Sequence, residues 1–236
     1  MSKTAIILAG GKGTRLRPYT WVLPKPLMPL GEEPILEIVI QQLVKSGFKN
    51  IILAVNHHAE IIKAVIGDGK RFGAKITYSL EKKALSTMGP LKLMKNLPEN
   101  FLVMNGDILT DLPFKTLFEV HLEQKSLFTI SGYHREHKVD YGVLHQDKKG
   151  FLTGFEEKPT QAYSVSMGIY VLNKKVLQFI PKDKAFGFDH LMYKLLEEKQ
   201  KVQVRNHKGL WLDIGRPDDY MQAIEAFEKL KPEILK

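Results

Sequence analysis

A glycine-rich loop near the start of the chain has the residue types of a phosphate-binding site. It reads Leu8-Ala9-Gly10-Gly11-Lys12-Gly13-Thr14-Arg15-Leu16 and directly follows a short apolar run. Glycines lack a Cβ, so backbone N–H groups can approach phosphate oxygens closely, and the planar guanidinium of Arg15 adds several donors. The loop therefore predicts binding of a polyphosphate, and a nucleoside triphosphate (NTP) is its natural ligand.

Two widespread phosphate-binding motifs do not fit this loop. It lacks the Gly-Lys-Ser/Thr ending of a P-loop. In the dinucleotide fingerprint the third glycine would occupy position 16, where this chain has Leu16. The phosphate chemistry expected here therefore belongs to neither of these classes.

Lys25 can place a positive charge over the same loop. It lies between Pro24 and Pro26, whose rings restrict the backbone on both sides. Taken alone, such a tripeptide is more typical of an exposed turn with a solvated lysine. Beside the glycine loop, we interpret Lys25 as a charge held at a transferring phosphoryl group.

Two aspartates follow apolar stretches that are far apart in the chain. Asp107 ends the run Val103-Met104-Asn105-Gly106, and Asp213 follows Leu210-Trp211-Leu212. Mg²⁺ takes oxygen ligands and keeps part of its shell for water and substrate phosphates, so two carboxylates can share one ion. Each aspartate alone has a simpler explanation, because Asn-Gly-Asp is common in turns and Asp213 can cap the last helix.

Alternating strands and helices must position these residues. Continuous apolar runs predict buried strands, and apolar residues at helical spacing predict helices between them. Strands are expected at 4–8, 50–55, 76–80 and 101–104, with helices at 34–46, 59–66, 89–95 and 113–124. Shorter strands at 127–133, 141–145, 151–156 and 165–172 precede helices near 174–179, 191–199 and 217–229. The pattern predicts an α/β fold whose first half is a parallel sheet with right-handed crossovers.

Composition sets the broad class of the chain. Its 236 residues include 35 Lys and Arg, 26 Asp and Glu, and 44% hydrophobic residues, giving a net charge of +9. These values are typical of a globular protein with a sizeable core and with anionic partners. The absence of Cys excludes disulfides, a thiolate nucleophile and Cys-ligated zinc. The basic residues are scattered, so a nucleic-acid surface is not expected.

The apolar N-terminal run is too short for a secretion signal, and no run is long enough to span a membrane. We therefore expect a cytoplasmic protein without membrane contact. No linker rich in Pro, Gly or Ser divides the chain, so a single domain over residues 1–236 is expected.

A longer pattern resembles a known family. The segment 8–37, LAGGKGTRLRPYTWVLPKPLMPLGEEPILE, is similar to the signature of the sugar-1-phosphate nucleotidylyltransferases, also called nucleotide-sugar pyrophosphorylases. Further similarity lies in Asn105-Gly106-Asp107, Asp140-Tyr141-Gly142-Val143, Glu156-Glu157-Lys158-Pro159, Gly168-Ile169-Tyr170-Val171 and Trp211-Leu212-Asp213-Ile214-Gly215. The resemblance implies a Rossmann-like α/β/α sandwich with a mixed, mainly parallel central sheet and a small antiparallel sugar-binding lobe. The left-handed β-helix domain of some members is not expected here.

The resemblance also implies roles for individual residues. Arg15 and Lys25 would be catalytic, and Asp107 and Asp213 would bind Mg²⁺. The nucleotide would be bound by Leu8, Ala9, Gly10, Gly11, Gly13, Thr14, Glu81, Ser86 and Thr87. The sugar phosphate would be bound by Gly142, Glu157, Lys158, Ser166 and Gly168. The base-binding segment departs from the family pattern, because Ser86 and Met88 replace a glycine and an alanine; Ser166 stands where members often have Asn.

The expected reaction is transfer of a nucleotidyl group from an NTP to a sugar 1-phosphate, giving an NDP-sugar and pyrophosphate. GTP is favoured because a carboxylate at Glu81 can accept from the adjacent N1–H and N2–H₂ donors of guanine, and a mannose-like sugar is the matching partner. The alternatives are a dTTP- or UTP-dependent glucose-1-phosphate enzyme and a non-catalytic regulatory subunit on the same fold. The sequence leaves the NTP, the sugar and assembly into a homo-oligomer open.

Overall fold

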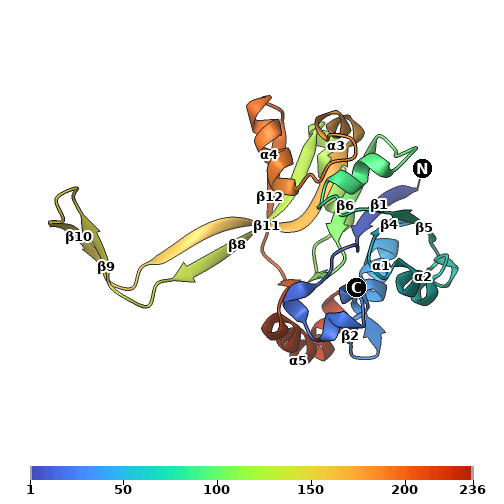
Figure 1. Ribbon diagram of the computed structural model, residues 1–236, viewed down its shortest axis with the longest axis horizontal. Helices are drawn as coiled ribbons and strands as arrows, with labels where there is room; N and C mark the ends of the chain where they lie inside the picture. Colours follow the sequence, from blue (N-terminus) through green and yellow to red (C-terminus); the bar gives the residue numbers. More distant parts are fainter. Residues whose placement is uncertain (1, 235–236) are drawn as a thin grey trace.

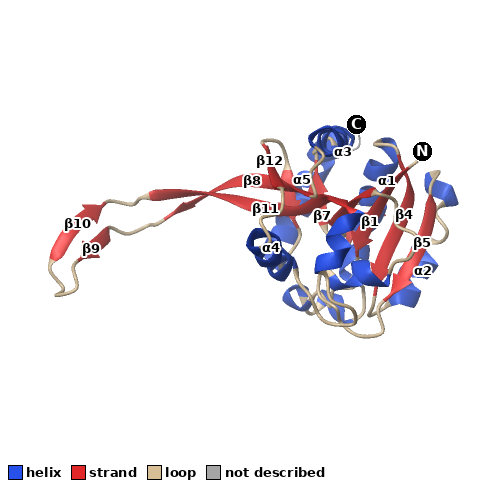
Figure 2. Cartoon of the chain, turned by 90° about the horizontal axis from the view of Figure 1, so that it is seen from above, coloured by secondary structure: helices blue, strands red, loops and turns tan. Residues whose placement is uncertain are grey.

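The computed structural model describes residues 2–234, apart from the side chains at 228, 230 and 233. Seven strands form one central sheet (Figures 1 and 2). In spatial order they are β12 (Val202–His207), β8 (Phe128–Lys138), β11 (Thr160–Asn173), β6 (Asn100–Asn105), β1 (Lys3–Leu8), β4 (Phe48–Val55) and β5 (Lys75–Leu80). Only β11 runs antiparallel to its neighbours in this sheet. The predicted mixed, mainly parallel sheet is confirmed.

Alternate residues of the central strands face two separate hydrophobic clusters. Ala5 and Ile7 of β1 face one cluster, and Ile6 between them faces the other. The first cluster includes side chains of α1 (Ile35–Lys45), α2 (Ala59–Ile66), α3 (Phe114–Gln124) and α5 (Pro217–Ile234). The second includes Leu191 and Leu195 of α4 (Phe188–Glu197). The expected α/β/α sandwich is therefore present.

Three two-stranded sheets are separate from the central one. They pair β2 (Pro29–Leu30) with β3 (Glu33–Pro34), β7 (Ile108–Thr110) with β13 (Trp211–Asp213), and β9 (Val143–Gln146) with β10 (Leu152–Glu156). The β7–β13 pair brings residues from two distant parts of the chain together beside the central sheet.

The antiparallel part of the chain has the form of a long arm. Strands β8 and β11 continue together beyond the body of the molecule, and the β9–β10 hairpin lies at their far end (Figures 1 and 2). The side chains of β8 are buried from Phe128 to Gly132 and exposed from His134 onward. We call residues 134–163 the arm.

The structure corrects some expected elements. The helix expected at 89–95 is a 3₁₀ helix over Gly89–Leu93. Strands β7 and β12 were not expected, and β8 and β11 are longer than the sequence pattern indicates. In the described part of the chain, every helix is too short or too polar to cross a membrane.

Candidate active site

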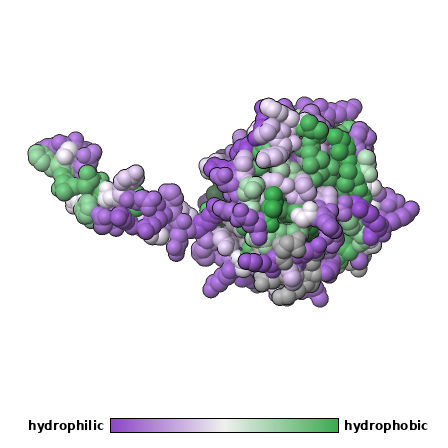
Figure 3. All heavy atoms as spheres, turned by 90° about the horizontal axis from the view of Figure 1, so that it is seen from below, coloured by the Kyte–Doolittle hydropathy of each residue, from purple (hydrophilic) through white to green (hydrophobic). Residues whose placement is uncertain are grey.

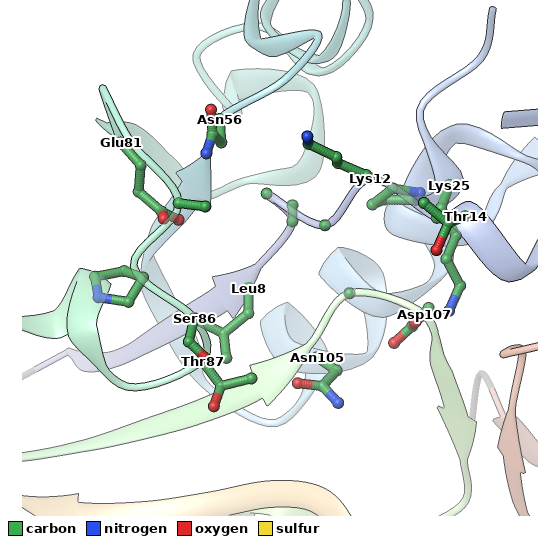
Figure 4. Close-up of a pocket in the computed structure, with 18 of the residues that line it drawn as sticks. Leu8, Lys12, Thr14, Lys25, Asn56, Glu81, Ser86, Thr87, Asn105 and Asp107 are labelled. Atoms are coloured by element: carbon green, nitrogen blue, oxygen red, sulfur yellow. Dashed lines mark hydrogen bonds and ion pairs between the residues drawn. The ribbon is translucent and has the colours of Figure 1, made fainter. Parts of the chain in front are cut away.

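A pocket of about 470 Å³ opens at the carboxyl ends of β1, β4, β5 and β6. The glycine-rich loop after β1 forms its centre, and residues that directly follow the other three strands surround it (Figure 4). This edge is where open α/β sheets bind ligands, because the loops there converge. The pocket contains every residue predicted to bind the nucleotide: Leu8, Ala9, Gly10, Gly11, Gly13, Thr14, Glu81, Ser86 and Thr87.

The backbone of the loop is fixed by a neighbouring threonine. Gly13 has φ +60°, a conformation that L side chains rarely adopt, and a Cβ there would lie 2.9 Å from Thr20 Cγ2. Thr20 Oγ1 donates a hydrogen bond to the Gly13 carbonyl over 2.7 Å. Position 13 therefore requires glycine both for its conformation and for its contact with Thr20.

Lys25 and Asp107 form an ion pair at one end of the pocket. Lys25 begins a 3₁₀ turn, Lys25–Leu27, and its side chain is 11% exposed against 17% for Asp107. The second carboxylate oxygen of Asp107, Oδ1, is buried and has no hydrogen-bond partner among the described residues. A buried carboxylate oxygen without a partner is costly, which makes it available to a ligand.

Asp213 lies beside Asp107 because β7 and β13 pair antiparallel. Asp213 is opposite Ile108, and the Ile214 N–H donates to the Asp107 carbonyl over 3.1 Å. Burial, followed by the negative charge of Asp107, raises the pKa of Asp213; Lys25 and Arg15 act in the opposite direction. The two carboxylates therefore repel each other, and a cation between them would relieve that repulsion.

Arg15 reaches the same end of the pocket from the glycine loop. Its guanidinium lies beside Gly215, where a Cβ would be 3.5 Å from both terminal nitrogens. The structure thus brings together the four residues Arg15, Lys25, Asp107 and Asp213, which come from three distant segments. Asp213 is not part of the pocket lining itself but lies next to Gly215, which is.

Glu81 lies at the opposite end of the pocket from Lys25 (Figure 4). It is buried, and its Oε2 accepts the Leu85 N–H over 3.1 Å. The Oε1 atom faces the loop, since a Cβ at Gly10 would be 3.0 Å from it. Burial raises the pKa of Glu81, and the hydrogen bond from Leu85 opposes that shift.

The two departures in the base segment have different structural consequences. Ser86 adopts φ +64°, the left-handed conformation that glycine favours, so the backbone keeps the glycine geometry despite the side chain. Met88 is fully buried in the second hydrophobic cluster and points away from the pocket. Thr87 Oγ1 accepts the Phe188 N–H over 2.8 Å and so connects the segment to α4. Only Ser86 adds atoms on the pocket side.

The residues predicted to bind the sugar phosphate are divided between two places. Ser166 and Gly168 lie at the irregular part of β11, and a Cβ at Gly168 would be 2.7 Å from Asn105 Nδ2, a pocket residue. Gly142, Glu157 and Lys158 lie on the exposed arm, outside the pocket lining. The structure does not bring these three together with Arg15 and Lys25 of the same chain.

The pocket also contains residues that the sequence analysis did not assign. Asn56 directly follows β4, Asn105 is the last residue of β6, and both line the pocket (Figure 4). Lys12 and Pro26 also line it. The signal for the two asparagines was available, because a polar residue immediately after a buried parallel strand lies at the ligand-binding edge.

Comparison with known proteins identifies the family. The model of the nucleotidyl transferase family matches residues 4–229, and the chain belongs to that family. Mannose-1-phosphate guanylyltransferase catalytic subunit beta of Drosophila pseudoobscura pseudoobscura is 36% identical over 93% of this chain and 61% of its own length. UTP--glucose-1-phosphate uridylyltransferase of Synechocystis is 35% identical over 94% of this chain and 62% of its own length. The chain thus spans about three fifths of these relatives.

A solved structure is similar over almost the whole chain. HddC from Yersinia pseudotuberculosis has a TM-score of 0.75 at 30% identity, covering 96% of this chain and all of HddC. The same protein complexed with GMP-PN has a TM-score of 0.73 at 29% identity and similar coverage. These likenesses agree with the α/β fold.

Proposed function

We propose that this chain transfers a nucleotidyl group from an NTP to a sugar 1-phosphate. A phosphate oxygen of the sugar 1-phosphate attacks the α-phosphorus, the bond from that phosphorus to the bridging oxygen breaks, and pyrophosphate leaves. The observation that carries the proposal is the gathering of Arg15, Lys25, Asp107 and Asp213 beside the glycine loop. Family membership and the named activities of the relatives support it.

The described residues suit catalysis by alignment and charge neutralisation. Backbone N–H groups at Gly10, Gly11 and Gly13 would hold the phosphates. The guanidinium of Arg15 and the ammonium of Lys25 would stabilise negative charge that develops at the α-phosphate and the leaving pyrophosphate. Neither residue needs to gain or lose a proton in this scheme, because no general acid or base is required.

The carboxylates of Asp107 and Asp213 fit a Mg²⁺ ion. Among the described residues no cluster of three or more His, Cys, Asp or Glu side chains is available, so water and phosphate oxygens would complete the shell. Two observations support this site. Asp107 Oδ1 has no hydrogen-bond partner among the described residues, and burial together with Asp107 raises the pKa of Asp213. A cation between the two carboxylates would give Oδ1 a partner and stabilise the charged form of Asp213. When bound, the ion would neutralise charge on the triphosphate.

We further propose guanine as the base and a mannose-like sugar. The carboxylate of Glu81 borders the end of the pocket away from Lys25, where the base would lie. Several relatives are named mannose-1-phosphate guanyltransferases, and HddC is complexed with GMP-PN. The named uridylyltransferase among the relatives keeps UTP with glucose 1-phosphate as the second candidate.

Pyrophosphate release measured for five NTPs against a panel of sugar 1-phosphates tests both parts of the proposal. GTP should exceed UTP and dTTP in kcat/KM by about tenfold or more. Glu81→Gln should shrink that ratio, whereas Glu60→Gln, an exposed change on α2, should leave it unchanged. If none of the tested pairs of NTP and sugar 1-phosphate releases pyrophosphate, the transferase activity is rejected and a regulatory subunit is favoured. Preference for UTP or dTTP would reject guanine only.

A further inference from the structure

The arm carries residues of the predicted site but contributes none of them to the pocket of its own chain. Glu157 and Lys158 are exposed and lie at its far part, where the β11 ribbon meets the β9–β10 hairpin. Gly142 lies against them, since a Cβ there would be 3.3 Å from Glu157 Oε2. Three of the five residues predicted to bind the sugar phosphate are therefore grouped on the arm, away from the pocket of the same chain.

The ribbon that carries this group is continuously paired. Residues of β8 and β11 pair without interruption from Lys138–Thr160 to Tyr133–Val165, and the Val139 N–H donates to the Pro159 carbonyl over 3.0 Å. Five exposed residues of β8 at about 3.3 Å each place the end of the ribbon roughly 17 Å beyond the body. Folding Glu157 and Lys158 back over their own pocket would break this pairing.

The tip of the arm exposes an apolar surface (Figure 3). Its large side chains are between 58% and 79% exposed, and they are Tyr141, Leu144, Phe151, Leu152 and Phe155. Leu144 and Phe155 are a cross-strand pair on one face of the hairpin. An isolated two-stranded hairpin is marginally stable in water, and exposed apolar patches mark interaction surfaces. The tip therefore requires a cover.

Charge and size favour a second copy of this chain as that cover. The arm contains five basic and five acidic residues, so the net charge of +9 belongs to the body. Two such bodies repel each other, whereas a neutral arm can contact either body without that penalty. The arm has thirty residues, about what one side of a standard protein interface uses.

The body offers a matching apolar surface beside the pocket. Tyr19, Trp21 and Val22 are 53%, 65% and 79% exposed. Thr20, among them, holds the glycine loop through its bond to Gly13. An arm seated on these residues would bring its tip to the rim of the pocket, next to the phosphate-binding loop.

We propose that the arm of each subunit completes the sugar end of the site in a second copy. Two copies related by a two-fold axis would exchange arms reciprocally, which is a closed arrangement that satisfies both apolar tips. Each pocket would then combine Arg15 and Lys25 of one chain with Glu157 and Lys158 of the other. This inference rests on the proposed function, which assigns the sugar phosphate to those two arm residues.

Complementation between two inactive variants tests the exchange. Lys25→Ala damages the body, and Lys158→Ala damages the arm. Co-expressed with different tags and purified as the mixed dimer, they should recover about half of the parent turnover per dimer, because one of the two sites is fully intact. The matched control pairs Lys25→Ala with Arg15→Ala, two body changes, and should recover nothing.

The outcomes separate the exchange from the proposed function. A mixed Lys25→Ala and Lys158→Ala sample no more active than its components means that the site forms within one chain, and overturns the exchange. Parent-like activity of Lys158→Ala alone would instead reject the role of the arm in binding the sugar phosphate. Melting curves establish that each variant is folded, and Lys25→Met replaces the alanine variant if it is not.

Sedimentation gives an independent readout. The parent should be a dimer at assay concentration, and Phe151→Asp with Phe155→Asp should give monomers that lose activity with sugar phosphate. Thr153→Asp, on the same strand, is the control and should remain dimeric. A fully active parent monomer, or an arm covered only by some other protein, would overturn the proposal.

Discussion

Four charged side chains lie at one end of the pocket, and their energies are coupled. Lys25 compensates part of the repulsion between Asp107 and Asp213 while leaving Asp107 Oδ1 without a partner. The proposed cation, bound between the two carboxylates, would relieve that repulsion and give Oδ1 a partner. We therefore expect binding and folding to be linked at these residues.

Lys25 and Arg15 are expected to differ in their effect on stability. Both Lys25→Ala and Arg15→Ala should lower turnover by about 10²-fold, because each removes a positive charge from the transferring phosphate. Only Lys25→Ala should also lower the melting temperature, because it leaves the largely buried Asp107 unpaired, at a cost of about 1–3 kcal/mol. Steady-state kinetics and thermal melts of both variants check this. Equal melting temperatures would show that the ion pair does not stabilise the fold.

Asp213 should show the opposite relation between activity and stability. Asp213→Asn removes a charge that burial and Asp107 both disfavour, so the melting temperature should stay the same or rise. Turnover should fall to background if the two carboxylates hold the required cation, and excess chelator should do the same to the parent. Asp218→Asn, an exposed change on α5, serves as the control. Full activity in chelator would reject the cation site.

At single residues the sequence predicted which side chains lie together better than it predicted their detailed geometry. The glycine loop, Lys25 and Asp107 could be singled out because the loop predicts phosphate binding and the family resemblance adds the other two, and the structure places all three in one pocket. The left-handed backbone at Ser86 and the inward orientation of Met88 could not be predicted, because they depend on packing against α4 and the second cluster. The separation of Lys158 from Lys25 depends on the course of β8 and β11, which no local pattern encodes.

A buried histidine connects three elements at the edge of the sheet where β6 and β8 begin, opposite the edge that borders the pocket. His121 of α3 lies within 2.8 Å of Thr129 Oγ1 on β8, and its other ring nitrogen lies 3.2 Å from Asn100 Oδ1 on β6. It is 1% exposed, and burial lowers its pKa from 6.5 to about 4. The neutral ring is therefore part of the folded state.

Acid should destabilise the protein through His121. In the unfolded chain His121 becomes protonated below pH 6.5, whereas in the folded chain it stays neutral down to about pH 4. Stability is therefore lost as the pH falls from 6.5 to about 4. The full loss is about 3 kcal/mol. Denaturant melts at pH 7.5 and 5 measure it, and His121→Gln should flatten the difference. His145→Gln, which is exposed, should not. If His121→Gln loses as much stability between pH 7.5 and 5 as the parent does, His121 is not the group responsible.

Sequence patterns predicted the central strands and the edge strand β5, and missed β12 at the other edge and the very short β7. Strands β1, β4 and β6 are continuous apolar runs because both faces are covered by helices. Strand β12, Val-Gln-Val-Arg-Asn-His, is half-exposed at the edge and mixes polar residues, so its pattern is weak. Strand β7 has three residues and exists because β13 pairs with it. Such elements are defined by partners rather than by periodicity.

The body of the molecule should fold without its arm. Neither hydrophobic cluster contains a residue of the arm. Replacing residues 139–159 by Asn-Gly joins Lys138 to Thr160 through a two-residue turn suited to the paired strands. The melting temperature should stay within about 4 °C of the parent, while saturation by sugar phosphate is lost and NTP binding remains. Loss of cooperative melting would show that the arm belongs to the core.

The order of the strands also determines when the pocket can be finished during synthesis. The four strands whose carboxyl ends surround the pocket, β1, β4, β5 and β6, all lie within the first 105 residues. Asp213, however, joins Asp107 only when β13 pairs with β7, more than a hundred residues later. At roughly 5–20 residues per second, that interval lasts about 5–20 s on the ribosome. A nascent chain can thus present a phosphate cradle well before it has the second carboxylate.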